Sequence, residues 1–287
     1  MSPPLQGAVD FRTRLKTEEY LSLYKSSSLT REYDKQFERM GVALDDSNEG
    51  EAEFIRAMDE CSIALAVYVG RDLESTAGWK LSNDHIAEVV ARHPGRLVGF
   101  AGIDPKKGRA AVIETRRCLR ELGLSGIAVD PFRARMPADD RQFYPLYEAC
   151  VEEGKPVIIT IGPLPSPTMY MDLGSPMAVD HVATDIPELT IVCSHGGWPF
   201  TNEMIAIAWR HERVYFETSL YENLPGSAAW VEAANTILMK KIVFASGYPA
   251  RSFVDAVKLY TSLPLSDIAR AHVMRDNALE LLRFPPG

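Results

Sequence analysis

The chain has 287 residues and a hydrophobic content of 46%, which is enough for one large domain with a sizeable core. Its 31 basic and 39 acidic residues are interspersed and give a formal net charge of −8, which disfavours nucleic acid and anionic membranes as general partners. No apolar run approaches the roughly 18 residues of a membrane span, and the first residues do not resemble a signal peptide, so we expect a cytoplasmic protein.

Eight strand-like runs recur along the chain, and most are almost entirely apolar and rich in Val and Ile. Strands that are buried on both faces of a parallel sheet have this composition. The stretches between them carry apolar residues at three- and four-residue spacings, as in 107–122 and 141–152. This alternation predicts an α/β fold, a (β/α)₈ TIM barrel, formed by residues 1–287 as a single domain. The expected strands are residues 7–11, 62–69, 97–103, 126–130, 156–161, 190–194, 214–218 and 242–246.

Two connections in this barrel are longer than usual. An insertion over residues 15–60 separates the first two strands, and we expect it to form short helices that cover the top of the barrel or contact a second copy of the chain. A peripheral decoration is the alternative. Residues 162–178 follow the fifth strand with four prolines and two glycines, which disfavour a regular element. They emerge at the carboxyl end of that strand, where active sites of such barrels lie.

Four cysteines lie inside apolar stretches, and no Cys-x-x-Cys motif is present. Buried free thiols in a reducing compartment are the expected state of such residues. They are Cys61, Cys118, Cys150 and Cys193.

Three strand ends carry distinctive sequences. Residues 8–14 read Ala-Val-Asp-Phe-Arg-Thr-Arg, residues 191–199 read Ile-Val-Cys-Ser-His-Gly-Gly-Trp-Pro, and residues 242–249 read Ile-Val-Phe-Ala-Ser-Gly-Tyr-Pro. Their order and spacing resemble the amidohydrolase superfamily, in the branch that includes decarboxylases of aromatic and unsaturated acids. The resemblance runs from Val9 to Leu282.

The resemblance implies a metal site built from Asp-x-His-x-His on the first strand, imidazoles from the fifth and sixth strands, and the aspartate of Ser-Asp-x-Pro. The matching positions in this chain are Arg12, Arg14, Thr160, His195 and Gly247. Only His195 could bind a metal, because a guanidinium group is always protonated and has no free lone pair. We therefore expect no metal cofactor, with a weakly held divalent cation at His195 as the alternative.

The two arginines could take over part of the metal's role. A guanidinium group can hold a carboxylate in bidentate fashion and stabilise a developing oxyanion. Side chains alternate along a strand, so Arg12 and Arg14 should share the inner face and bind a small anionic molecule. The alternative is that they pair with Asp10, Asp130 or Glu217 and fill the vacated site.

His195 is the main candidate for general acid–base catalysis, because its unperturbed pKa of about 6.5 suits neutral pH. A structural histidine held by hydrogen bonds is the alternative. Asp130 and Glu217, at the ends of the fourth and seventh strands, are further catalytic candidates. The residues expected to bind substrate, besides the two arginines, are Thr160, Trp198 and Tyr248; Trp198 could instead pack beneath residues 162–178.

Three functions fit this pattern. The first is a metal-independent hydrolase that acts on a small carboxylated substrate such as a lactone, which is electrophilic enough for arginine polarisation and a general base. The second is a non-oxidative decarboxylase of an aromatic or unsaturated acid, that is, a lyase. The third is a non-catalytic family member or supporting subunit, which the loss of an aspartate at position 247 favours.

Overall fold

Eight parallel strands form a barrel in the computed structural model, which describes residues 7–26, 38, 50–162 and 169–283. The strand order is β1-β2-β5-β6-β7-β8-β9-β10. The amide of Phe11 donates to the carbonyl of Phe244 at 2.9 Å, and Thr13 bridges to Tyr248, so the first and last strands meet and the predicted TIM barrel is confirmed. The strands are β1 Ala8–Thr13, β2 Ile63–Val69, β5 Leu97–Gly102, β6 Gly126–Val129, β7 Val157–Ile159, β8 Ile191–Cys193, β9 Val214–Glu217 and β10 Ile242–Val243.

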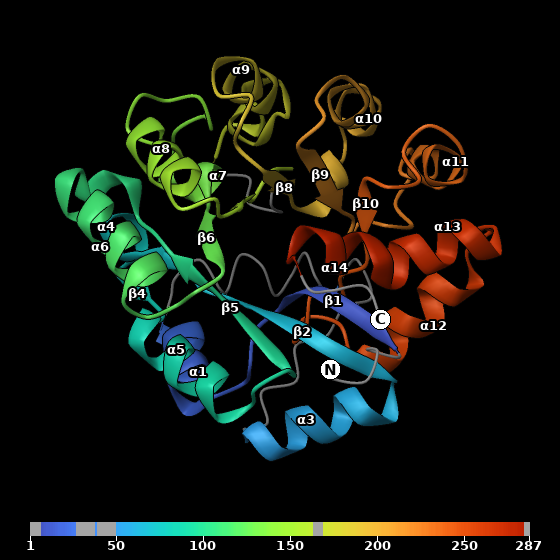
Figure 1. Cartoon of the computed structure of the whole chain (residues 1–287), viewed down its shortest axis with the longest axis horizontal. Helices are drawn as coiled ribbons and strands as arrows, with labels where there is room; N and C mark the ends of the chain where they lie inside the picture. The colour runs from blue at the N-terminus through green and yellow to red at the C-terminus, as the bar shows by residue number, and fades with distance from the viewer. Residues whose placement is uncertain (1–6, 27–37, 39–49, 163–168, 284–287) are drawn as a thin grey trace.

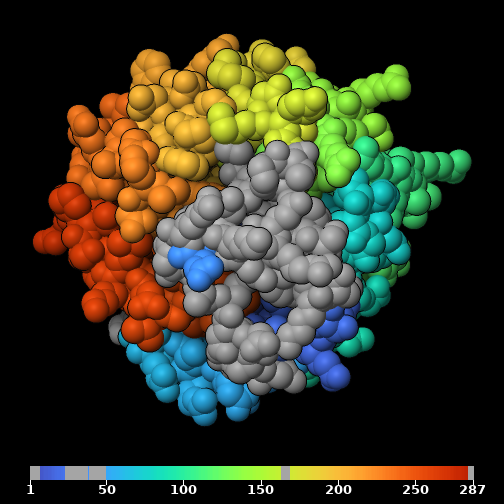
Figure 2. All heavy atoms as spheres, turned by 180° about the vertical axis from the view of Figure 1, so that it is seen from behind, coloured from blue at the N-terminus to red at the C-terminus, as the bar shows by residue number. Residues whose placement is uncertain are grey.

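The longer helices between residues 83 and 235 follow one another round the outside of the barrel in chain order (Figure 1). Figure 2 shows the opposite side, where the coloured segments again succeed one another round the rim. The longer helices are α1 Glu18–Ser26, α3 Glu51–Glu60, α5 Asn83–Arg92, α6 Arg109–Arg120, α8 Tyr144–Glu152, α9 Met177–Asp185, α10 Thr201–Arg210, α11 Ala229–Asn235 and α12 Phe253–Ser262. The shorter ones are α4 Glu74–Ala77, η1 Pro105–Lys107, α7 Pro131–Ala134, η2 Met171–Gly174, η3 His195–Gly197, α13 Asp267–Ala271, η4 His272–Asp276 and α14 Asn277–Leu281.

Most of the strands are almost entirely apolar because alternate residues enter two different cores. Ile158 of β7 belongs to a cluster of strand side chains that α14 also joins. Its neighbours Val157 and Ile159 belong to the larger cluster shared with the surrounding helices. Burial on both faces of the sheet explains why the sequence shows nearly unbroken apolar runs.

Two helices of the 15–60 insertion lie within the described residues, as expected. In α3, Phe54 and Met58 are buried, and Phe54 packs edge-on against Phe253 with ring centroids 5.2 Å apart. In α1, Tyr20 packs edge-on against Trp79 at 6.2 Å. Trp79 belongs to a small antiparallel hairpin, β3 Asp72–Leu73 and β4 Trp79–Lys80, that the sequence did not predict. Residues 27–37 and 39–49 of the insertion lie outside the described residues.

The remaining sequence expectations concern the cysteines and the membrane. All four cysteines are free, and Cys118, Cys150 and Cys193 are buried. Within the described ranges, no helix has both the length and the apolar character that a membrane crossing requires.

Candidate active site

Arg12 is the centre of the first group of side chains at the carboxyl ends of the strands. Its guanidinium group donates from Nη1 to Ser194 Oγ at 2.5 Å and from Nη2 to Thr160 Oγ1 at 3.5 Å. Its Nε lies 3.7 Å from Glu217 Oε1, and the side chain is 3% exposed. The structure therefore brings together three residues predicted from sequence, Arg12, Thr160 and Glu217. Sequence analysis missed Ser194, although it directly precedes His195.

Glu217 contacts the backbone as well as the guanidinium group of Arg12. Its Oε2 accepts a hydrogen bond from the amide of Ser219 at 2.6 Å. This contact fixes the backbone beyond β9, which in turn faces His195. The alternative in which an acid pairs with Arg12 is thus partly confirmed, through Glu217 rather than Asp10.

His195 is buried directly after β8, with a φ of 62°. Its Nδ1 lies 2.9 Å from the carbonyl oxygen of Ser219, so this nitrogen carries the proton and donates it to the carbonyl. Burial, followed by the positive charge of Arg12, holds the pKa of His195 well below 6.5. The ring is therefore neutral near pH 7, with its lone pair on Nε2.

Arg14 lies one residue beyond β1, and the register of β1 against β2 shifts between Asp10 and Thr13. The side chain is 8% exposed, and its Nε has no hydrogen-bond partner within the part of the chain that the structure describes. Burial lowers the pKa of Arg14 well below its usual value, and the neighbouring charges of Arg71 and Arg12 lower it further. Arg12 and Arg14 are thus both buried.

Asp130 lies between two further arginines, Arg71 and Arg133, whose charges act on Arg14. Its Oδ2 lies 3.4 Å from Arg71 Nη2 and 3.6 Å from Arg133 Nε. Asp130 also accepts the amide of Arg133 at 3.3 Å and so begins helix α7. The guanidinium carbon of Arg71 lies 5.6 Å from the centre of the Trp79 ring. Burial, reinforced by Arg133, lowers the pKa of Arg71 to about 10.

Asp10 has a backbone role. Its Oδ1 accepts hydrogen bonds from the amides of Arg12 and Ser246, both at 3.0 Å. These contacts tie β1 to the chain beyond β10. Burial raises the pKa of Asp10 to about 7 despite both hydrogen bonds. Asp10 is therefore not the ion-pair partner that one alternative assigned to the arginines.

The two aromatic candidates are placed differently. The Trp198 ring stacks on Tyr221 at 5.5 Å, and Tyr221 meets the His195 ring edge-on at 5.2 Å. Trp198 therefore lies one ring away from His195. Tyr248 contributes its carbonyl, which accepts the amide of Arg14 at 2.9 Å, while its ring stacks on Phe253 at 4.6 Å. The Tyr248 ring also packs against Phe54 of α3 at 5.3 Å, so its contacts favour packing over substrate binding.

The side chains around His195 do not fit the metal site that the family resemblance implies. Among the described residues, no group of three or more His, Cys, Asp or Glu side chains could hold a metal ion. The space beside His195 is shared by a guanidinium group and hydroxyl groups, which are poor substitutes for imidazole and carboxylate ligands. At the position of the family aspartate, Gly247 has a φ of 73°, and an added Cβ would lie 2.9 Å from Leu220 Cγ.

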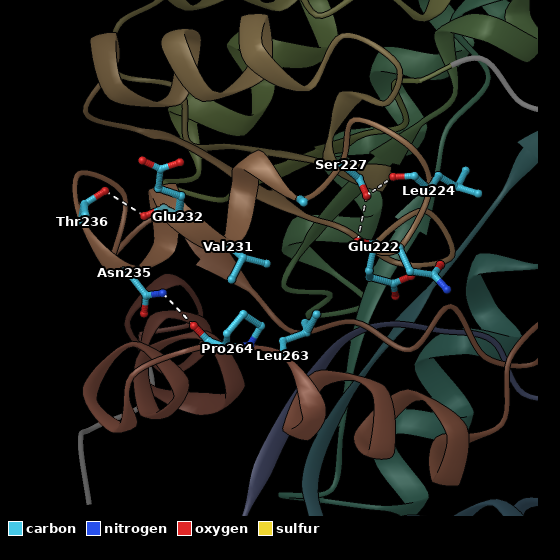
Figure 3. Close-up of a pocket in the computed structure, with 11 residues that line it drawn as sticks. Glu222, Leu224, Ser227, Val231, Glu232, Asn235, Thr236, Leu263 and Pro264 are labelled. Atoms are coloured by element: carbon cyan, nitrogen blue, oxygen red, sulfur yellow. Dashed lines mark hydrogen bonds between the residues drawn. The ribbon is translucent and has the colours of Figure 1, made fainter.

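A separate pocket of about 490 Å³ opens on the flank of the barrel, between α11 and the turn after α12 (Figure 3). Its deepest acid, Glu222, accepts hydrogen bonds from Arg251 Nη1 at 2.7 and 2.6 Å. Burial raises the pKa of Glu222 to about 7. None of the residues predicted for the active site lines this pocket, so it is distinct from the arginine-rich strand ends.

Comparison with known proteins identifies the class. The family model for amidohydrolases matches residues 35–284, so the chain belongs to the amidohydrolase family. The resemblance stated from the sequence is confirmed at this level.

Curated relatives are mostly decarboxylases. Over 249 residues the chain is 25% identical to the 2-amino-3-carboxymuconate-6-semialdehyde decarboxylase of Dictyostelium discoideum, with 71% of this chain and 66% of that protein, just under two thirds, covered. It is 24% identical to the γ-resorcylate decarboxylase of Polaromonas sp. over 71% of this chain and 75% of that protein. It is 29% identical to the 2-keto-4-carboxy-3-hexenedioate hydratase of Sphingobium sp. over 47% of this chain and 45% of that protein.

Solved structures support the fold. An uncharacterised TIM-barrel protein of Bordetella bronchiseptica, Bb4693, superimposes with a TM-score of 0.84 at 28% identity, covering 96% of this chain and 98% of that one. The 2,6-dihydroxybenzoate decarboxylase from Rhizobium superimposes with a TM-score of 0.71 at 18% identity, covering 97% and 99%. At that identity the second match concerns the fold alone.

Proposed function

We propose that the protein is a lyase that decarboxylates a small unsaturated or aromatic acid without a metal ion. The observation that carries the proposal is the Arg12 guanidinium group, held by Ser194 and Glu217 at a strand end next to His195. The relatives favour decarboxylation over the hydrolase expectation, since two of the three named above are decarboxylases. The hydratase among them acts on a carboxylated compound by a different reaction.

Arg12 holds the substrate in this proposal. A guanidinium group binds a carboxylate through two parallel N–H···O bonds, and at a dry strand end such a charge-assisted contact is stronger than in water. Negative charge that accumulates on a conjugated substrate during the reaction is stabilised by the same N–H donors. Glu217 and Ser194 keep the guanidinium group in place, and Glu217 therefore positions Arg12 instead of transferring a proton.

His195 supplies the proton. When the bond between the carboxylate carbon and the substrate breaks, the electron pair passes into the conjugated system and CO₂ leaves. A proton must then reach the carbon that lost CO₂. Burial and Arg12 keep His195 neutral in the empty site, and the negative charge of a bound carboxylate favours its protonated form. The imidazolium Nε2 then delivers the proton, which solvent replaces.

Lactone hydrolysis is the second candidate, and one observation favours it. The neutral His195, with Nδ1 committed to the Ser219 carbonyl, can use Nε2 as a base toward water. Arg12 would polarise the lactone carbonyl. Both reactions use the same two residues, so the products must distinguish them.

The experiment is a product analysis on a panel of unsaturated and aromatic acids and lactones, in D₂O as well as in H₂O. Decarboxylation predicts one CO₂ for each product molecule and one deuterium at the carbon that lost it. Arg12→Met should lower kcat/KM strongly, while His181→Asn, at an exposed histidine, should not. A lactone converted to a hydroxy acid heavier by one water, without release of CO₂, would replace decarboxylation with hydrolysis. Absence of turnover on the whole panel would favour the non-catalytic alternative.

A further inference from the structure

We propose that Arg14, Arg71 and Arg133 form a second anion subsite beside Arg12, so that the substrate carries at least two carboxylates. This inference rests on the proposed function for its reaction, and it adds the chemical class of the substrate. The subsite is built from the ends of three strands, because Arg14 follows β1, Arg71 follows β2, and Arg133 lies in α7 after β6.

Arg14 carries the argument, because its charge is buried among other positive charges. Nine-tenths of the side chain is removed from solvent, and its Nε has no hydrogen-bond partner among the residues that the structure describes. Its nearest charged neighbours include Arg71 and Arg12, both of which disfavour a further cation. A buried charge in this setting is costly unless an anion offsets it. A substrate carboxylate at Arg14 provides that anion.

The described side chains supply too little negative charge for the cluster. Asp130 contacts Arg71 and Arg133, and Glu217 contacts Arg12. Arg12 and Arg71 each contact one of these acids, whereas among the described residues no acid contacts Arg14. Asp10 does not supply the missing negative charge, because its pKa of about 7 leaves it substantially protonated at neutral pH. A second substrate carboxylate at Arg14 would supply it.

The two subsites are far enough apart to need separate carboxylates. A strand advances about 3.3 Å for each residue, so the backbones of Arg12 and Arg14 are separated by roughly 6–7 Å. Arg12 donates to Thr160 and Ser194, which directly follow β7 and β8, whereas the charge of Arg71, which follows β2, acts on Arg14. One bidentate contact with a guanidinium group uses both oxygens of a single carboxylate. The arrangement therefore selects an acid with one carboxylate at Arg12 and another at Arg14.

The test measures binding without turnover. Succinate, glutarate, adipate and cis,cis-muconate would be titrated calorimetrically against wild-type protein beside monocarboxylates of equal length. We expect at least one dicarboxylate to bind about 10- to 100-fold more tightly than its monocarboxylate, the range of one charged hydrogen bond. Arg14→Met should remove that preference while changing monocarboxylate affinity about twofold or less. Arg71→Met should reduce it, and Arg116→Met, at a half-buried arginine that pairs with Glu152, should leave it unchanged.

Stability measurements keep the result interpretable if a variant is damaged. Arg14 is buried beside other arginines, and its Nε has no hydrogen-bond partner among the described residues, so Arg14→Met should raise the melting temperature of the ligand-free protein. Weaker dicarboxylate binding by this variant would then not come from unfolding. Arg14→Lys keeps the charge and should retain part of the preference. Equal affinity of wild type for mono- and dicarboxylates would overturn the inference.

Turnover separates the two proposals. A dicarboxylate preference that depends on Arg14, with no decarboxylation of any acid, would support the subsite and reject the proposed reaction. Decarboxylation of monocarboxylic acids that Arg14→Met leaves unchanged would support the reaction and reject the subsite.

Discussion

The Nδ1 atom of His195 lies 2.9 Å from the carbonyl oxygen of Ser219, and this contact determines which ring nitrogen faces the reaction. Since a carbonyl only accepts, Nδ1 must donate, and the basic lone pair is left on Nε2. The amide of the same Ser219 donates to Glu217, whose other carboxylate oxygen lies 3.7 Å from Arg12. The backbone of Ser219 thus links the orientation of the His195 ring, the proposed proton donor, to that of the Arg12 guanidinium group, the proposed substrate-binding group.

Replacement of His195 should abolish most of the turnover while leaving the fold intact. Asparagine is the suitable substitute, because its side-chain amide can still donate to Ser219 and because it tolerates the positive φ of this position. We expect His195→Asn to lower kcat by about 10²–10⁴-fold, the usual contribution of general acid–base catalysis. Steady-state kinetics and far-UV circular dichroism would be measured together. A folded variant with wild-type kcat would show that another group moves the proton.

Asp10 should make stability depend on pH. Its pKa is about 7 in the folded protein against about 3.8 when unfolded, so the folded state binds the extra proton between these values. The stabilisation from Asp10 is therefore complete below about pH 4 and is lost as pH rises to about 7. Urea unfolding of wild type and Asp10→Asn at pH 5 and pH 8 should show the variant gaining stability relative to wild type at the higher pH. Asp267→Asn, at an exposed position, should show no such gain, and an equal gain in both variants would contradict the assignment.

Gly247 should resist substitution for two separable reasons. Its φ of 73° disfavours any side chain, and a Cβ would approach Leu220 Cγ to 2.9 Å. We expect Gly247→Ala to lower the free energy of unfolding by about 1–3 kcal/mol. Gly78→Ala is the matched control, because Gly78 has a φ of 63° and open space where its Cβ would lie. An equal loss in the two variants would mean that Leu220 moves aside at no cost.

Sequence patterns predicted the barrel well because each strand is buried on both faces. All eight expected strands are present, although the run at 242–246 contains only Ile242–Val243 as regular strand. Beyond Val243 the backbone serves the site instead, since the amide of Ser246 donates to Asp10. The hairpin at residues 72–80 has strands of two residues, which are too short to show a period.

The candidate site was predictable in part. The family resemblance singled out Arg12, Arg14, Thr160 and His195, and these positions come together because parallel strands of a barrel end at one face. Arg71 follows the second strand, but the sequence does not reveal that Asp130 approaches it. The sequence did not predict a role for Arg133, because its place near Arg14 depends on how α7 turns after Asp130. The packing of Tyr248 against Phe253 likewise follows from helix placement.

The central claim is that the Arg12 guanidinium group does the work of a metal ion in binding and activating the substrate. The most direct test is CO₂ release by protein dialysed against a strong chelator, with metal content measured by elemental analysis in the same sample. We predict full turnover with far less than one metal ion per chain and no gain from added zinc or manganese. Turnover that disappears with the metal and returns in proportion to one equivalent of it would contradict the account.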